Sequence, residues 1–320
     1  MDTTRLFTQD AGGRIDFFVV SAFKKRPGIV PVSKSLAHSL PAFALGAILA
    51  LAGANVGAAP LSGGPLYLAM GDSLAAGVGS SDPDTLAYVP LNREHLVVLL
   101  DEPNLGLVNL GVSGETSAKL ITDGQLASAI ALLTERNSDR SQKNDVQVVT
   151  INIGGNDAIG LFLYWFGNCA GQGIPRPPQC QFAFNDVLFQ FEQNLDIILS
   201  DLRTAAGPHT DIVVATNYNP LVQPVCFFFF PQAIQTVNVI LEGGENFDLL
   251  VVPEDGGLND ITRRVASDHG VLVADVVPGG EFPALLGPKD IVAEEFDCAH
   301  ANDDGHEIIA DTFKDALKDK

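Results

Sequence analysis

The sequence predicts an α/β fold, a three-layer α/β/α sandwich around a five-stranded parallel sheet. Five short apolar runs, most of them rich in Val and Ile, end at or near turn residues such as Gly, Asn or Pro. Such runs are typical of strands that are buried on both faces. Apolar stripes of helical period lie between them. Strand and helix patterns therefore alternate, as they do where helices cover both faces of a parallel sheet.

Turn residues set the ends of the five expected strands. The first strand stops at Gly71, and the third reads VQVVTINI and stops at Gly154 and Gly155. The expected strands cover residues 66–70, 107–110, 146–153, 212–216 and 271–276.

Three apolar stripes predict helices between and after the strands. Within each stripe the residues recur three or four positions apart, so they share one face of a helix. The last stripe follows Asn302 and Asp303, either of which is a candidate N-cap. The segment 217–257 shows no clear pattern. The stripes consist of Leu126, Ile130 and Leu133, of Leu188, Phe191, Leu195, Ile198 and Leu202, and of Ile309, Phe313 and Leu317.

The composition excludes several classes of protein. The chain has 320 residues, of which 46% are hydrophobic and 18% charged, so it is not an intrinsically disordered chain. It carries 19 Lys and Arg against 39 Asp and Glu, a net charge of −20. Nucleic-acid binding needs clustered positive charge, so we expect no nucleic-acid partner. The acidity favours a soluble, self-repelling surface, and we expect a monomer.

The first 59 residues have the features of a targeting segment. Lys24, Lys25 and Arg26 precede an apolar stretch at 40–54 that ends in small residues, as in a secretory signal peptide. This stretch is shorter than the roughly 20 residues that a spanning helix needs. The alternative is an uncleaved anchor. The sequence therefore predicts an exported protein with a single domain at 60–320.

Four cysteines, all within 60–320, indicate disulfide bonds. An even number in an exported chain favours two disulfides over metal ligands or thiol catalysis. The sequence contains no C-x-x-C pair, the spacing that would indicate a zinc site. Three pairings are possible. The short Gly- and Pro-rich loop favours Cys169–Cys180, which leaves Cys226–Cys298 by elimination.

Polar and glycine residues follow the first three expected strands, at the sheet edge where ligands bind in open parallel sheets. Ser73 lies just after Gly71, on a strand-to-helix turn where a helix N-terminus favours developing negative charge. Ser is also a common N-cap. A serine nucleophile needs a base, and His300 has Asp297 three residues before it to orient its ring.

Three groups could donate to a developing oxyanion: the N–H groups of Ser73 and Gly114, and the side-chain amide of Asn156. Taken singly, such a glycine or asparagine is more often a turn residue. Of the other histidines, we interpret His269 as a surface or helix-end residue and His306 as a packing or capping residue at a helix start.

Four segments resemble the conserved blocks of the GDSL, or SGNH, hydrolase family, and they occur in the family's order. GDSLAAGVG at 71–79 resembles block I, NLGVSGETS at 109–117 block II, GGND at 154–157 block III and DCAH at 297–300 block V. One departure is Ala301, where the family commonly has proline.

This resemblance implies a flavodoxin-like sheet and ester hydrolysis through an acyl-enzyme, without a metal or organic cofactor. It implies that Ser73 is the nucleophile, His300 the base and Asp297 its orienter. Ser73, Gly114 and Asn156 would form the oxyanion hole. Asp72 and Asp157, which belong to blocks I and III, are interpreted as structural.

Two apolar segments predict an acyl-binding wall. One, at 161–166, contains Phe162 and Trp165; the other, at 226–231, contains Phe227 and Phe228. Four consecutive phenylalanines cannot all face one core, although two-sided burial in a long loop is an alternative. The wall favours a lipid or other small-molecule acyl ester as substrate, with transient contact to a lipid surface. The alternatives are a carbohydrate deacetylase, an acyltransferase, or a catalytically silent lipid-binding protein.

Overall fold

The structure, a computed structural model, describes residues 63–138, 142–169, 178–222, 233–245, 251–252, 256–276 and 299–318, with two short segments at 8–9 and 15–16. Those two segments form β1 (Thr8–Gln9) and β2 (Ile15–Asp16), an antiparallel pair within the first 52 residues. The apolar stretch at 40–54, on which the expected targeting segment depends, lies outside the described residues. No helix in the described ranges is both long and apolar enough to cross a membrane.

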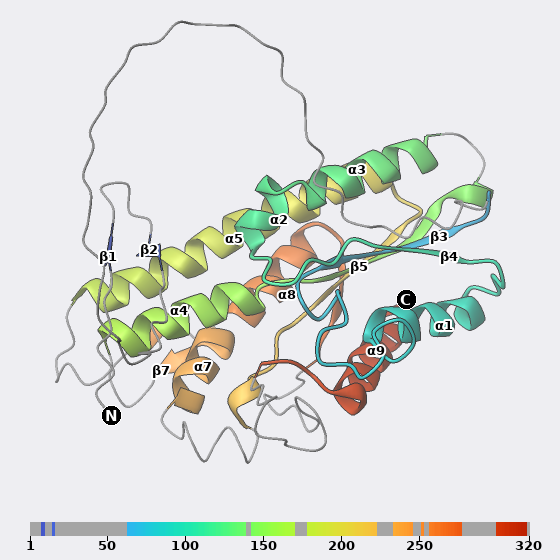
Figure 1. Ribbon diagram of the computed structural model, residues 1–320. Helices are drawn as coiled ribbons and strands as arrows, with labels where there is room; N and C mark the ends of the chain where they lie inside the picture. The colour runs from blue at the N-terminus through green and yellow to red at the C-terminus, as the bar shows by residue number, and fades with distance from the viewer. Residues whose placement is uncertain are drawn as a thin grey trace, which may run out of the picture. The chain divides into compact units, whose positions relative to one another are not determined.

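Five parallel strands form the central sheet, in the order β4-β3-β5-β6-β9 (Figure 1). This is the flavodoxin-like order that the family resemblance implied, with the first strand of the sheet, β3, between the second and the third. All five expected strands are confirmed to within two residues at each end. Their bounds are β3 Leu66–Gly71, β4 Gly106–Asn109, β5 Val146–Asn152, β6 Asp211–Ala215 and β9 Leu272–Ala274.

Helices cover both faces of the sheet, which confirms the three-layer sandwich. One buried cluster joins the sheet to α2 (Ser117–Thr122), α3 (Gln125–Arg136), α4 (Gly155–Asn168), α5 (Pro178–Ala206), α7 (Ala233–Glu242) and α8 (Leu258–Asp268). A second cluster on the opposite face contains α1 (Tyr88–Leu99) and α9 (Asp303–Lys318). The short pieces are η1 (Gln142–Asn144), η2 (Pro220–Val222) and the ladder of β7 (Gly244–Glu245) and β8 (Val251–Val252).

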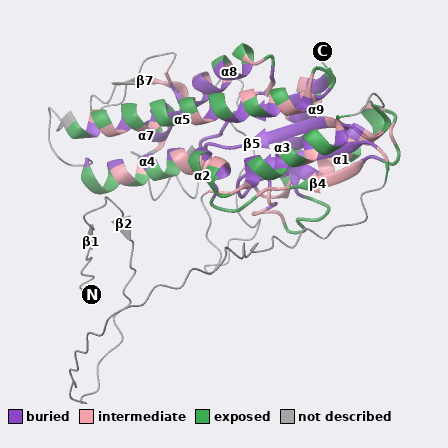
Figure 2. Cartoon of the chain, turned by 90° about the horizontal axis from the view of Figure 1, so that it is seen from above, coloured by how far each residue is buried: buried purple, intermediate pink, exposed green. Residues whose placement is uncertain are grey.

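The expected apolar stripes lie on α3, α5 and α9 and face the sheet. All their residues are buried except Ile130, which is half-buried, and Figure 2 shows these faces as buried while the opposite faces are exposed. Asn302 caps α9, because its Oδ1 accepts the N–H of Gly305 at 3.0 Å. The segment 217–257, which shows no clear pattern, contains α7.

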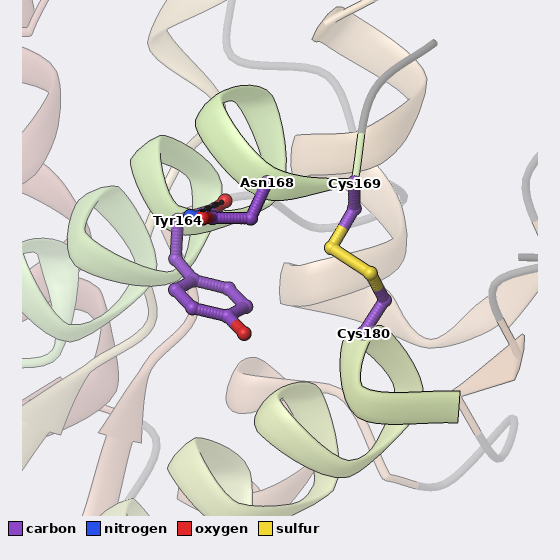
Figure 3. The surroundings of a disulfide bond; sticks show 4 residues. All are labelled: Tyr164, Asn168, Cys169 and Cys180. Carbon is purple, nitrogen blue, oxygen red and sulfur yellow. Dashed lines mark hydrogen bonds between the residues drawn. A yellow bond between two sulfur atoms is a disulfide. The ribbon is translucent and has the colours of Figure 1, made fainter. Parts of the chain in front are cut away.

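One of the two expected disulfides is present in the described residues. Cys169 and Cys180, both buried, join the end of α4 to the first turn of α5 (Figure 3). Beside it, Asn168 Nδ2 donates to the Tyr164 carbonyl at 2.9 Å within the last turn of α4. The expected Cys226–Cys298 pair lies outside the described residues.

Candidate active site

Ser73 lies in a tight turn that starts where β3 ends. The Asp72 N–H donates to the Asn152 carbonyl of β5 at 3.0 Å, so the chain is still tied to the sheet one residue before the serine. The Ser73 carbonyl then accepts the Val78 N–H at 2.9 Å, which closes the turn. Asp72 Oδ1 accepts the Leu74 N–H at 3.0 Å. These contacts confirm the structural role expected for Asp72.

The side chain of Gln125 holds the strand end itself, and the sequence analysis missed it. Its Oε1 accepts the Gly71 N–H at 2.7 Å, and its Nε2 donates to the Gly71 carbonyl at 3.0 Å. Gly71 has a φ of +133°, a conformation that glycine adopts most readily. The amide thus satisfies both backbone groups at the point where the chain leaves the sheet. Nothing in the local pattern around Gln125 signals this pairing.

His300 reaches Ser73 across 227 positions of sequence. Its Nε2 lies 2.8 Å from Ser73 Oγ, which is hydrogen-bond distance. Ser73 is buried, while His300 is half-buried. The structure therefore brings together the expected nucleophile and its expected base. The expected orienter, Asp297, lies outside the described residues.

The residues after His300 fold back onto the turn that carries Ser73. His306 Nδ1 accepts the Tyr88 N–H at 3.2 Å, and its Nε2 lies 3.1 Å from the Val78 carbonyl. These partners require a neutral ring protonated on Nε2, in line with burial, which lowers the pKa of His306. The role expected for His306, packing at a helix start, is confirmed.

Asn156 lies in the first turn of α4 and lines the pocket described below. Its Nδ2 donates to the Glu115 carbonyl at 2.8 Å, which fixes the orientation of the amide. Gly154, just before α4, has a φ of +111°, and a Cβ there would lie 2.9 Å from Phe191, so this sharp entry into the helix requires glycine. Gly114 precedes Glu115 and also has a positive φ, of +80°.

The loop after β4 is tied to the same edge of the sheet. The Val112 N–H donates to the Gly71 carbonyl at 3.0 Å, and Glu115 N–H donates to the Val112 carbonyl at 3.2 Å. Together with the bond between Glu115 and Asn156, these contacts hold the Gly114 loop between the strand end that precedes Ser73 and the start of α4.

Asp157 has the structural role expected for it. Its carboxylate accepts the Ser117 N–H at 3.0 Å and the Ser117 hydroxyl at 2.7 Å, which ties the start of α4 to the start of α2. Burial raises the pKa of Asp157, and the bonds from Ser117 act in the opposite direction.

The carboxyl of Asp72 is also affected by burial, which raises its pKa to about 7. The hydrogen bond from the Leu74 N–H and the charge of nearby His300 act in the opposite direction.

A pocket of about 320 Å³ opens beside Ser73 and His300. Its polar lining residues are Asp72, Ser73, Asn156, Asn217, Tyr218 and His300. The other side chains of the lining are apolar, and α4 and α7 contribute most of this apolar wall. The apolar lining residues are Leu74, Ala158, Ile159, Phe162, Leu163, Pro220, Leu221, Val237 and Leu241.

Of the two expected wall residues in α4, only Phe162 lines the pocket. Trp165 is buried in the core at 4% exposure, with its ring centroid 6.2 Å from that of Phe162. One turn of helix separates the two side chains, so Trp165 supports the wall from behind. The other expected wall residues, Phe227 and Phe228, lie outside the described residues.

Away from the pocket, His269 ends α8 and its Nε2 lies 2.7 Å from Asp196 Oδ1, which confirms the helix-end role expected for it. Among the described residues, no group of three or more His, Cys, Asp or Glu side chains is arranged to hold a metal ion.

Comparison with known proteins shows which family the chain belongs to. Residues 69–308 match the model of the GDSL-like lipase/acylhydrolase family. The chain belongs to this family. Members are hydrolases, and membership supports ester hydrolysis in general terms. No curated protein matches the sequence.

Several solved structures are similar to this chain at low sequence identity. A lipase from a goat rumen metagenome is 17% identical, with 78% of this chain and 96% of that chain covered and a TM-score of 0.50. An enzyme from the metagenome of Lake Arreo in Spain is 21% identical, with 80% and 95% covered and a TM-score of 0.46. An extracellular lipase from Streptomyces rimosus is 18% identical, with 80% and 99% covered and a TM-score of 0.47.

Proposed function

We propose that this GDSL-family chain is an exported serine ester hydrolase that cleaves acyl esters through an acyl-enzyme on Ser73. One observation carries the proposal: His300 Nε2 lies 2.8 Å from Ser73 Oγ, and both residues line a largely apolar pocket. A hydroxyl within hydrogen-bond distance of an imidazole is the arrangement that activates a serine nucleophile.

In the first half of the reaction, His300 Nε2 takes the proton of Ser73 as Oγ attacks the ester carbonyl carbon. The tetrahedral intermediate collapses when the C–O bond to the alcohol breaks and the imidazolium gives its proton to the leaving alkoxide. In the second half, water loses a proton to His300 and attacks the acyl-enzyme, and Ser73 recovers its proton as the acid leaves. Asp297 would accept the other ring N–H and stabilise the imidazolium.

The oxyanion of each tetrahedral intermediate needs donors that are already in place. We assign this role to the N–H groups of Ser73 and Gly114 and to the amide of Asn156. A primary amide has two N–H bonds, and Glu115 accepts one from Asn156. That bond orients the amide, so its second N–H can serve the oxyanion without reorganisation.

The acyl group would occupy the apolar part of the pocket, between α4 and α7. The side chains of this wall, such as Phe162, Leu221, Val237 and Leu241, cannot form a hydrogen bond with a sugar hydroxyl. Each methylene group buried against them contributes about 0.8 kcal/mol to binding. A lipid or fatty-acyl ester therefore fits this wall better than an acetylated sugar. Phe227 and Phe228 stay candidates for the same wall from the sequence alone.

One face of α4 continues from the pocket to the protein surface. Ile159 and Leu163 line the pocket and are 39% and 53% exposed, and Phe166, one turn further on, is 50% exposed. Exposed apolar residues that adjoin a binding site are typical of contact with a lipid surface. We assign transient lipid contact to this face.

Export is supported by the disulfide, because disulfides persist mainly in oxidising compartments. We propose residues 1–59 as the targeting segment and 60–320 as the catalytic domain, acting as a monomer.

The test is hydrolysis of a p-nitrophenyl ester series, from acetate to palmitate, by the disulfide-bonded 60–320 domain and its Ser73→Ala variant. We expect a Ser73-dependent rate that rises toward medium or long chains. A rate confined to acetate would refute the lipid substrate and favour a deacetylase. No rate with any ester would refute hydrolysis and leave a transferase or a binding protein.

A second variant tests the acyl wall directly. Val237→Phe adds volume inside the pocket, whereas Val98→Phe adds the same volume at a surface position that is 81% exposed. Loss of burial for three or four methylene groups corresponds to about 60- to 200-fold in kcat/KM. We expect that loss for long esters and little loss for acetate, in Val237→Phe alone. Equal losses for all esters would refute the assignment of the acyl site.

A further inference from the structure

The residues that follow His300 touch an exposed loop that follows the Ser73 turn, and one carboxylate makes most of the polar contacts. Asp303 Oδ1 accepts the Ser81 N–H at 2.7 Å and the Ser80 hydroxyl at 3.1 Å. Its Oδ2 accepts the Ser81 hydroxyl at 2.6 Å. Three donors from two consecutive residues, separated from Asp303 by more than 220 positions in sequence, therefore meet one side chain.

This carboxylate is not needed as the N-cap of its own helix. Asp303 is the first residue of α9, but Asn302 already caps that helix by accepting the Gly305 N–H. An acidic residue in the first turn gains from the helix dipole, yet Asp304 occupies the same turn and offers the same charge. What distinguishes Asp303 is its set of bonds to Ser80 and Ser81.

The chain just after Ser73 is bound to α9 on both sides of Gly79. Before Gly79, the Val78 N–H donates to the Ser73 carbonyl, and the Val78 carbonyl accepts from His306 Nε2; after it, Ser80 and Ser81 bind Asp303. Gly79 itself lies so close to His300 that an added Cβ would be 2.8 Å from the His300 Cβ. His300 therefore lies against Gly79, in the segment just before Asp303 and His306, the two residues whose side chains bind the chain on either side of Gly79.

We propose that Asp303 is a positioning residue for the reaction, and this rests on the proposed function of Ser73 and His300. By binding Ser80 and Ser81 it presses the segment 300–303 against Gly79 and so maintains the 2.8 Å separation of His300 Nε2 from Ser73 Oγ. A hydrogen-bonded charge holds geometry more firmly than neutral pairs, because its bonds are about twice as strong.

Loss of this carboxylate lowers the rate of the chemical step and leaves substrate binding intact. The apolar walls belong mainly to α4 and α7, which Asp303 does not touch through these bonds. A misplacement of about 1 Å near the chemistry costs about 100-fold. Since the contacts of Gly79 and His306 persist, we expect a partial shift and a loss of about 10-fold in kcat, with KM within about twofold of wild type.

The experiment compares Asp303→Ala and Asp303→Asn with the matched control Asp304→Ala, in the full 60–320 domain. The control removes the same charge from the same helical turn, at an exposed position. The asparagine keeps one acceptor oxygen for Ser81 and should restore part of the lost kcat. We expect kcat to be highest in wild type, lower in Asp303→Asn and lowest in Asp303→Ala. The control Asp304→Ala should have the kcat of wild type. Melting temperatures report any general loss of folding.

Two further measurements separate positioning from a structural role. Ser81→Ala combined with Asp303→Ala should lower kcat no more than Asp303→Ala alone, because the two residues act through one contact. The second measurement is the rate at which a p-nitrophenyl phosphonate covalently labels Ser73. This rate depends on the activation of Ser73 by His300 but not on catalytic turnover, and it should fall in parallel with kcat.

The outcomes distinguish the two proposals. If wild type is not labelled at Ser73 and shows no ester hydrolysis, the proposed function fails and the positioning role fails with it. If wild type is labelled but Asp303→Ala reacts at the same rate, only the positioning role is refuted. Equal losses of kcat in Asp303→Ala and Asp304→Ala, or additive losses with Ser81→Ala, would also refute it.

Discussion

Replacing Gly79 by alanine is expected to damage catalysis far more than folding. Gly79 has a φ of +94°, and a Cβ there would overlap the carbonyl oxygen of Ala301 and lie 2.8 Å from the Cβ of His300. Ordinary contacts of a Cβ begin at 3.4 Å. Because the obstacle includes backbone, no rotation of a flexible side chain can relieve it.

The size of the effect follows from these distances. The segment 300–301 must retreat from Gly79 by roughly 1 Å before the overlap with the carbonyl is relieved. His300 Nε2 is now 2.8 Å from Ser73 Oγ, so such a retreat breaks the hydrogen bond that activates the serine. A misplacement of about 1 Å costs about 100-fold in rate. The left-handed backbone adds about 1–2 kcal/mol of destabilisation.

The assay is kcat for a p-nitrophenyl ester, with urea unfolding measured in parallel. Gly207→Ala is the matched control, since Gly207 also has a positive φ, of +73°, but open space where the Cβ would lie. Both variants should lose the stability that the positive φ costs an alanine, and only Gly79→Ala should lose about 100-fold in kcat. If Gly79→Ala keeps wild-type kcat while folded, the close approach does not set the position of His300 and the reasoning is wrong.

Three further predictions concern stability. Replacing Cys169 and Cys180 by alanine should lower the unfolding free energy by about 3 kcal/mol. It should leave kcat unchanged, since the bond is at the end of α4 away from the pocket; calorimetry and the ester assay check both. Burial raises the pKa of Asp72 from 3.8 to about 7, so the folded state binds its proton more tightly and stability falls as the pH rises through that interval. Asp72→Asn should remove this slope in urea unfolding between pH 4 and 7. Gln125→Glu should cost about 1–3 kcal/mol in urea unfolding at pH 8, because a carboxylate oxygen then faces the Gly71 carbonyl.

The sheet was predictable because its strands are short and apolar and because turn residues mark their ends. Gly71 and Gly154 mark strand ends that also carry the candidate site, so fold and site came from the same signals. Helices were harder to predict from the sequence. Pro90 falls in the first turn of α1, where its missing N–H is not needed, and the continuous apolar run 161–166 in α4 hides a helical period.

Within the site, the sequence named Ser73 and His300 as candidates because acyl transfer requires a nucleophile and a base, and the structure places the two side chains 2.8 Å apart. It missed the groups that hold the surrounding chain in place. Gln125 and Asp303 are polar residues in the first turns of helices, where such residues are common for local reasons. Their actual partners lie 54 and more than 220 positions away, and no local pattern encodes a contact at that range.

The two faces of the sheet contribute different parts of the site. The proposed base, His300, comes from the segment before α9, a helix of the cluster that also contains α1. The proposed acyl wall comes from α4 and α7, which belong to the opposite cluster. Ser73 lies just after the end of β3, the strand next to the middle strand β5. We therefore expect Val237→Phe to change the size of the proposed acyl pocket without moving His300, and substitutions of Asp303 and Gly79 to act on His300 without reshaping that wall. If so, chain-length preference and the rate of the chemical step should respond to different substitutions.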